Sequence, residues 1–109
     1  MAGITNDIRT MTYNDVISTI TIHLRKNKAS SDYRSFFIGC SNDIKKIIER
    51  HNASKEENLL ITCKASSLHE ARDAKNYFVL LGMVGDFFND DDGSIVYCYK
   101  IGMNTIENE

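Results

Sequence analysis

The sequence predicts a single α/β (α+β) domain in which helices pack against a small three-stranded sheet, in the order α-β-α-β-α-β. Two capping boxes each precede a stretch of apolar residues at helical spacing. Three short segments rich in apolar and β-branched residues alternate with these stretches. A chain of 109 residues, 42% of them hydrophobic, can bury one modest core. We therefore expect one domain over 1–109, with its core over about 12–101 and loose ends at 1–11 and 102–109.

The first predicted helix covers residues 13–27. Thr12 and Asp15 form a capping box, a hydroxyl followed three residues later by an acid. The apolar residues that recur at helical spacing are Tyr13, Val16, Ile17, Ile20 and Leu24. The same stretch alternates Ile20, Ile22 and Leu24 with polar residues and is rich in β-branched side chains, so a strand is the alternative. We favour the helix because the capping box is specific to a helix start.

A strand over 34–39 and a helix over 43–52 are predicted next, and the glycine at position 39 ends the strand. Within the helix, Ile44, Ile47, Ile48 and His51 are spaced i, i+3, i+4 and i+7, which predicts one apolar face. Because His51 continues that face, we expect it to be packed and hydrogen-bonded rather than a metal ligand.

The second half of the chain continues with a largely apolar strand over 59–65. Ser67 and Glu70 form the second capping box, for a helix that extends through Leu81, and Gly82 is expected to end it with a positive φ angle. The predicted apolar stripe of this helix consists of Leu68, Ala71, Ala74, Tyr77, Phe78 and Leu81. A turn at 89–93 then precedes an alternating strand over 94–101.

Charge and hydropathy favour a cytoplasmic protein. The net charge of -2 provides no general attraction for nucleic acid, so nucleic-acid binding would require a local basic patch. No apolar run approaches the roughly 18 residues of a membrane span. The first residues also lack the basic and apolar regions of a signal peptide.

No pattern predicts a metal ion or a cofactor. Cys40, Cys63 and Cys98 form no C-x-x-C pair, so we expect free thiols packed as small apolar groups. The three histidines lie on separate predicted elements. The acidic residues 90–92 lack the alternating acids and the final glutamate of a calcium-binding loop, so we expect a turn.

A series of short motifs runs in order from about residue 33 to 101. Its members are Phe37-Ile38-Gly39, Ser41-Asn42-Asp43-Ile44-Lys45-Lys46, His51-Asn52, Lys64-Ala65-Ser66-Ser67, Glu70-Ala71-Arg72-Asp73, Tyr77-Phe78, Leu81-Gly82-Met83 and the closing stretch 91–100. This series resembles a degenerate domain of the GIY-YIG nuclease superfamily, in particular its compact bacterial branch. The segment 37–39 stands where that family has Tyr-Ile-Gly, and no clear Gly-Ile-Tyr precedes it.

Active members of that superfamily are metal-dependent phosphodiesterases, and the resemblance implies where their chemistry would fall. In the family a tyrosine helps to activate the attacking water, an arginine steadies the phosphate charge and a glutamate holds the divalent metal. In this chain the three positions correspond to Phe37, Ile47 and Lys75. The loss of the hydroxyl, the cation and the carboxylate predicts a domain that does not cleave phosphodiesters.

We therefore expect a non-catalytic GIY-YIG-like binding domain, a small regulatory or inhibitory protein that contacts a protein or nucleic-acid partner. The candidates for phosphate or nucleic-acid binding are Ser41, Lys45, Lys46 and Arg50, at and beyond a predicted helix start. Phe87 and Phe88 are candidates for protein contact, because consecutive aromatics in an extended segment cannot both face one core.

Two alternatives stay open. The first is a divergent metal-dependent endonuclease that uses Arg50 with Glu70 or Asp73. The second is a purely structural homodimer, which neither cleaves phosphodiesters nor binds another partner.

Overall fold

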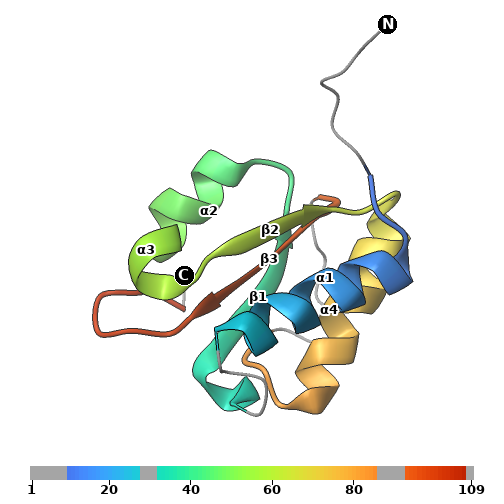
Figure 1. Ribbon diagram of the computed structural model, residues 1–109. Coiled ribbons are helices and arrows are strands. Elements are labelled where there is room, and N and C mark those ends of the chain that lie inside the picture. The colour runs from blue at the N-terminus through green and yellow to red at the C-terminus, as the bar shows by residue number, and fades with distance from the viewer. Residues whose placement is uncertain (1–9, 28–31, 86–92, 108–109) are drawn as a thin grey trace, which may run out of the picture.

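The computed structural model describes residues 10–27, 32–85 and 93–107, and its elements follow the predicted order (Figure 1). They are α1 (Tyr13–Lys26), the 3-10 helix η1 (Tyr33–Ser35), β1 (Phe36–Ser41), α2 (Ile44–His51), α3 (Lys55–Asn58), β2 (Ile61–Lys64), α4 (Leu68–Leu81) and β3 (Ile95–Lys100). The predicted α+β class is confirmed, with η1 and α3 as short additions. Within the described ranges, no helix has the length and apolar character required to cross a membrane.

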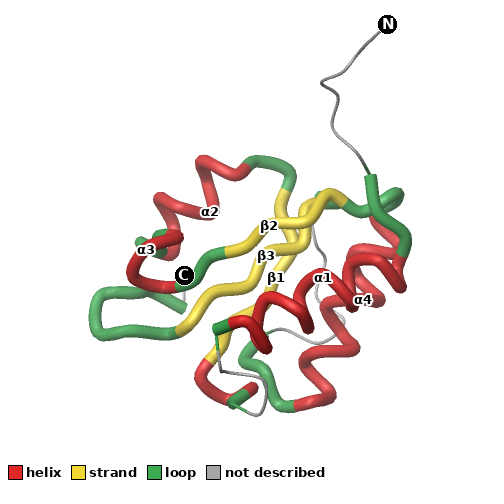
Figure 2. The backbone as a smooth tube through the Cα atoms, in the orientation of Figure 1, coloured by secondary structure: helices red, strands yellow, loops and turns green. Residues whose placement is uncertain are grey.

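The three strands form one antiparallel sheet in the order β1-β3-β2, so the last strand of the chain lies in the centre (Figure 2). Tyr97 of β3 stands opposite Gly39 of β1 on one side and opposite Thr62 of β2 on the other. This register places β1 and β2, which are far apart in the sequence, within two strand spacings of each other.

Helices cover both faces of the sheet and give the molecule three layers (Figure 1). α1 and α4 pack against each other and on one face, whereas α2 and α3 lie on the other. The first face holds the larger core cluster, which includes Val16, Ile20, Leu24, Phe36, Ile38, Cys63, Phe78, Val96 and Cys98. The second face holds a smaller cluster of Ile47, Ala53, Leu60, Tyr97 and Tyr99.

Helix α1 confirms the helical interpretation of residues 13–27, and the strand alternative is wrong. The Thr12 hydroxyl accepts from the backbone N–H of Asp15 at 3.2 Å, and the Asp15 carboxylate accepts from the N–H of Thr12 at 3.4 Å. Val16, Ile20 and Leu24 are buried on the inner side of the helix. Each burial contributes about 1.5–3 kcal/mol, which outweighs the weak strand propensity of this stretch.

Helix α2 has the predicted position, but its buried face is narrower than the spacing suggested. Ile47 and His51 are buried, whereas Ile44 and Ile48 are 45% and 44% exposed. A helix of only two turns contacts the sheet through one row of side chains, here Ile47 and His51. The adjacent row, Ile44 and Ile48, therefore stays partly exposed to solvent. The prediction that His51 is packed and hydrogen-bonded is confirmed.

Helix α4 also starts at its predicted cap, because the Ser67 hydroxyl accepts from the N–H of Glu70 at 3.1 Å. Ala71, Ala74 and Phe78 are buried as predicted. The rest of the predicted stripe is wrong: Leu68, Tyr77 and Leu81 are exposed, and Lys75 is buried instead. Gly82 ends the helix with a φ of 123°, as the sequence predicted.

Cys63 and Cys98 are free thiols that lie buried between the sheet and its helices. Burial raises the pKa of the Cys63 thiol to about 11, and it also raises the pKa of Cys98. These two buried thiols therefore behave as the small apolar groups that we expected.

Candidate functional site

Four rings gather on the α2 face of the sheet, at the place where the Phe-Ile-Gly motif lies. Phe37 of β1 stacks on Tyr99 of β3, with ring centres 5.5 Å apart, and its centre is 4.9 Å from that of His51. Tyr97 and Tyr99 are parallel to within 5°, at 6.5 Å. We refer to Phe37, His51, Tyr97 and Tyr99 as the aromatic cluster.

His51 is held at both nitrogens of its ring and is only 1% exposed. Its Nδ1 donates to the carbonyl of Ile106 at 2.5 Å. A carbonyl can only accept, so Nδ1 must carry a hydrogen, and in a neutral imidazole Nε2 is then an acceptor. This arrangement suits the Tyr97 hydroxyl, which lies 2.8 Å from Nε2.

Tyr99 connects the cluster to the segment that follows β3. Its hydroxyl lies 3.0 Å from Nδ1 of His51 and donates to Oε2 of Glu107 at 3.0 Å. Burial, together with the hydrogen bond and charge of the Glu107 carboxylate, raises the pKa of this phenol above its ordinary value. The ionised form of Tyr99 is therefore disfavoured in the folded protein.

The segment 102–107 is attached to the body of the domain, although the sequence led us to expect a loose end. The backbone N–H of Ile106 donates to the His51 carbonyl at 2.9 Å, and Asn52 donates to the carbonyl of Asn104 at 2.9 Å. These bonds add to those that His51 and Tyr99 make with the same segment. Tertiary hydrogen bonds over more than fifty residues are not visible in local composition, which explains the error.

Gly39 is the member of the Phe-Ile-Gly motif with a clear steric role. A Cβ atom at this position would lie 2.6 Å from the Tyr97 hydroxyl and 2.8 Å from the ring carbon that bears it. Both distances are shorter than van der Waals contact. The absence of a side chain at Gly39 therefore lets the Tyr97 phenol reach His51 across β1.

The three positions that the resemblance connects with catalysis lie in different surroundings. Phe37 and Ile47 belong to the smaller core cluster on the α2 face. Lys75 is on α4, the helix that covers the opposite face, and is 1% exposed. Among the described residues, no group of three or more His, Cys, Asp or Glu side chains is placed to hold a metal ion.

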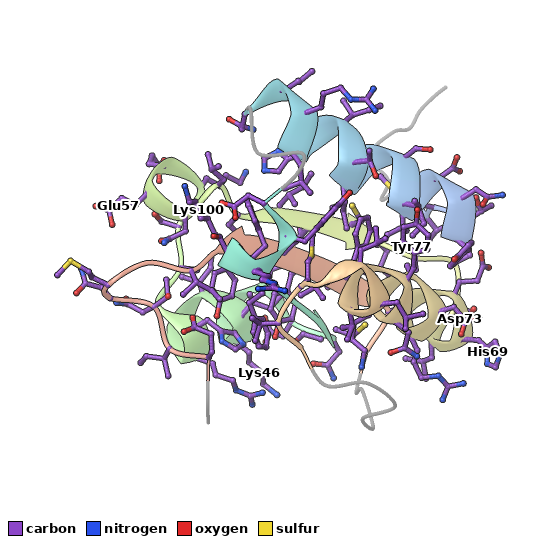
Figure 3. The ribbon with its side chains drawn as sticks, turned by 90° about the horizontal axis from the view of Figure 1, so that it is seen from below. Lys46, Glu57, His69, Asp73, Tyr77 and Lys100 are labelled. Carbon is purple, nitrogen blue, oxygen red and sulfur yellow. The ribbon has the colours of Figure 1, made fainter. Side chains whose placement is uncertain are left out.

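The basic side chains predicted for α2 lie on its outer surface. Lys45, Lys46 and Arg50 are all exposed, and Figure 3 shows Lys46 at the edge of the molecule. None of the three forms an ion pair within the described part of the chain. They give α2 a cationic outer face (Lys45, Lys46 and Arg50), which the helical spacing had indicated.

The start of α2 is less suited to a phosphate than the sequence suggested. The Asp43 carboxylate already accepts from the N–H of Lys45 at 2.9 Å, and it places a negative charge at the helix start. The Ser41 hydroxyl is engaged with the backbone of Asp43, at 3.2 Å from its N–H and 3.3 Å from its carbonyl. Ser41 is therefore not a free donor for an anion.

An open groove runs between α2, the start of α3 and β2. Its volume is about 290 Å³. Most of the surface that lines the groove is apolar. The lining residues are Ile44, Ile48, Ala53, Ser54, Lys55, Glu56, Leu60 and Thr62. Helical spacing gave no indication of this groove, because it places Ile44 and Ile48 on the same apolar face as the buried Ile47.

The remaining predicted site residues, Phe87 and Phe88, lie outside the described residues.

Tyr97 and Tyr99 were not predicted as site residues, although the sequence contains a pattern that indicates them. Alternate residues of a strand share one face, so the Tyr-Cys-Tyr pattern predicts two phenols side by side.

Comparisons with models of protein families, with curated proteins and with solved structures give no match for this chain.

Proposed function

We propose that this chain is a non-catalytic binding domain of GIY-YIG-like character, a small regulatory or inhibitory protein that contacts a protein partner through the outer side of α2. The observation that supports a non-catalytic domain is that the polar groups of the aromatic cluster are hydrogen-bonded within the protein. Both ring nitrogens of His51 and the hydroxyl of Tyr99 are already bonded within the protein. A catalytic site needs such groups directed at a substrate.

Two of the positions that correspond to catalytic residues in the GIY-YIG superfamily also support a non-catalytic domain. Phe37 offers a ring without a hydroxyl and stacks within the cluster, and Ile47 offers a buried alkyl group. Neither side chain can transfer a proton or stabilise a developing negative charge. A mechanism that depends on those two positions has no group there to perform it.

The character of α2 supports binding to a protein. The cationic outer face stands beside Ile44 and Ile48, two half-exposed apolar side chains, and beside the acidic Glu49 on the same helix. Mixed apolar and charged surfaces are typical of protein interfaces, whereas nucleic-acid sites concentrate positive charge. Nucleic acid remains the second candidate partner because of Lys45, Lys46 and Arg50.

The divergent endonuclease is less well supported. Arg50 is on α2, whereas Glu70 and Asp73 are on α4, on the other side of the sheet, and Figure 3 shows Asp73 well apart from Lys46 of α2. The Glu70 carboxylate also accepts from the backbone N–H of Tyr13, which occupies it at the start of α1. A structural homodimer is the third possibility, and light scattering tests it directly.

Binding is tested by affinity capture from the native host, with and without nuclease treatment. The triple variant Lys45→Glu, Lys46→Glu, Arg50→Glu should lose its partner. A control with the same charge change, Arg25→Glu, Lys26→Glu, Arg34→Glu, alters three exposed residues on other elements and should retain the partner. Equal capture by both variants would contradict the role of α2, and capture that disappears after nuclease treatment would assign a nucleic-acid partner.

The absence of catalysis is tested separately by plasmid nicking with Mg²⁺ or Mn²⁺. We expect no cleavage above the level of the buffer. Cleavage that Arg50→Ala abolishes would overturn the proposal in favour of the nuclease.

A further inference from the structure

A second pocket lies between the start of α1 and the outer side of α4, on the face of the sheet opposite α2 (Figure 1). Its volume is about 330 Å³, and its lining residues are Tyr13, Asp73, Asn76, Tyr77 and Leu80. The four residues of α4 are spaced i, i+3, i+4 and i+7, so they share one side of the helix. Figure 3 shows Tyr77 on the side of α4 that faces α1 and Asp73 nearer the start of α4.

Two tyrosine rings form two walls of this pocket. The rings of Tyr13 and Tyr77 are nearly perpendicular, at 86°, and their centres are 6.4 Å apart. The Glu70 carboxylate accepts from the backbone N–H of Tyr13, which fixes the start of α1 against α4. Tyr77 is 38% exposed, so solvent reaches its ring. Because the face of an aromatic ring carries partial negative charge, the corner between the two rings attracts a cation.

The charge around the pocket is also negative. The exposed carboxylate of Asp73 forms no ion pair within the part of the chain that the structure describes. The side-chain oxygen of Asn76 is buried without a hydrogen-bond partner among the described residues, so no donor compensates its partial charge. The basic residues of α4 are Arg72, which lies 3.2 Å from Nδ1 of His69, and the buried Lys75, and neither lines the pocket. The pocket therefore favours a positively charged group.

We propose that this pocket binds the ammonium group of a lysine side chain that belongs to a protein partner. The ammonium group lies against the rings of Tyr13 and Tyr77 and donates to the Asp73 carboxylate. The methylene stem of the lysine lies along Leu80, which is 75% exposed and offers an apolar surface. The pocket thereby provides a partner for each part of the lysine side chain.

A partner protein is a better source of this group than a small free cation or a second copy. Because Tyr77 and Leu80 are open to solvent, a free cation would bury little surface and would still lose its translational freedom. In a second copy, the exposed lysines of α2 would be the occupants. Such a contact joins two different surfaces and would build open chains of molecules rather than a closed dimer.

The inference goes beyond the proposed contact through α2, and the two hold or fail independently. NMR titration of the ¹⁵N-labelled full chain tests it with a short blocked peptide that has one lysine between two glycines. We expect the backbone amides of Asp73, Asn76 and Tyr77 to shift and to saturate. A matched peptide with norleucine in place of lysine keeps the stem without the charge, and it should bind at least about fivefold more weakly.

Substitutions separate the contributions of the carboxylate and the ring. Asp73→Asn and Tyr77→Leu should each weaken binding of the lysine peptide by about two- to fivefold, whereas Tyr77→Phe keeps the ring and should retain binding. Glu57→Gln is the matched control, because it removes one negative charge from an exposed residue of α3. Figure 3 shows Glu57 far from Asp73, so this variant should bind as the unaltered chain does.

Four outcomes would overturn the proposal. The first is equal binding of the lysine and norleucine peptides, and the second is an equal effect of Asp73→Asn and Glu57→Gln. The third is tighter binding of tetramethylammonium than of the lysine peptide, which would assign the pocket to a small free cation. The fourth is self-association in light scattering that Asp73→Asn abolishes, which would assign the pocket to a second copy.

Discussion

The face of the sheet beneath α1 and α4 is packed with alkyl, phenyl and thiol groups, whereas the face beneath α2 is packed with rings that hydrogen-bond to one another. On the first face, residues such as Phe36 and Val96 contribute only apolar area. On the second face, His51 and Tyr99 each need polar partners, and those partners come from Ile106 and Glu107. The first face is therefore sensitive to lost volume, and the second is sensitive to lost hydrogen bonds and to steric change.

The largest effect is expected from Phe36→Ala, on the α1 and α4 face. Phe36 is fully buried, so the substitution leaves a cavity and should lower the free energy of unfolding by about 3–5 kcal/mol. Urea unfolding at neutral pH measures this difference. Phe36→Leu keeps most of the volume and should cost clearly less; equal losses for both variants would argue against volume as the property that matters on this face.

Gly39→Ala is expected to have the next largest effect, on the α2 face. The new Cβ would collide with the Tyr97 hydroxyl, and the overpacking should cost about 1–3 kcal/mol of unfolding free energy. Tyr97→Phe removes the nearest colliding atom and should restore part of the loss in a double-mutant cycle. Strict additivity of the two substitutions would show that the collision is not the cause.

Tyr99→Phe should cost about 0.5–1.5 kcal/mol, because it removes a buried hydroxyl and leaves the Glu107 carboxylate without that donor. Combination with Glu107→Gln should cost less than the sum of the two single losses. Tyr77→Phe removes a phenol hydroxyl from an exposed ring on α4 and serves as the control. We expect no measurable change in its free energy of unfolding. A similar loss for both tyrosines would indicate that the bond to Glu107 contributes nothing.

Alkaline pH should weaken both faces, in different ranges. A pKa that is raised on folding stabilises the native state below the unfolded value, and this stabilisation is lost as the pH rises. The pKa of Cys63 rises from 9.0 to about 11, so its contribution should fall between those values. The pKa of Tyr99 is also raised, so its contribution should fall from about pH 10 upwards.

Unfolding free energies measured between pH 7 and 11 separate these two contributions. Cys63→Ala should reduce the decline that begins at about pH 9 but not abolish it, because the pKa of the buried Cys98 thiol is also raised. Tyr99→Phe should reduce the decline only above about pH 10. A decline between about pH 9 and 10 that is as steep in Cys63→Ala as in the unaltered protein would contradict the assignment to Cys63.

The smallest effect is expected outside both faces. Leu80 lies on the outer side of α4 and is 75% exposed, so Leu80→Ser should change the free energy of unfolding by less than about 0.5 kcal/mol. Urea unfolding beside Phe36→Ala gives the comparison. A loss above about 1 kcal/mol would mean that another part of the chain or a second copy covers this helix.

Part of the candidate site was accessible from the sequence. Helical spacing in α2 placed Lys45, Lys46 and Arg50 on the outside and His51 on the inside, and the structure agrees with both. The spacing could not separate Ile47 from Ile44 and Ile48, since the width of the buried face depends on what packs beneath the helix. Helical spacing also gave no indication that Lys75 would lie on the buried face of α4.

The starting points of the three longer helices are encoded locally in the sequence. Thr12, Asp43 and Ser67 cap them through side chains that reach a backbone N–H two or three residues ahead, and such local bonds are visible in the order of residues. The hydrogen-bond partners within the aromatic cluster, in contrast, depend on how the whole domain packs. His51 meets Ile106 across 55 positions of the chain, and Tyr97 meets His51 across 46, because the sheet brings β3 between β1 and β2. Bonds of that range depend on the packing of the whole domain, which no local pattern contains.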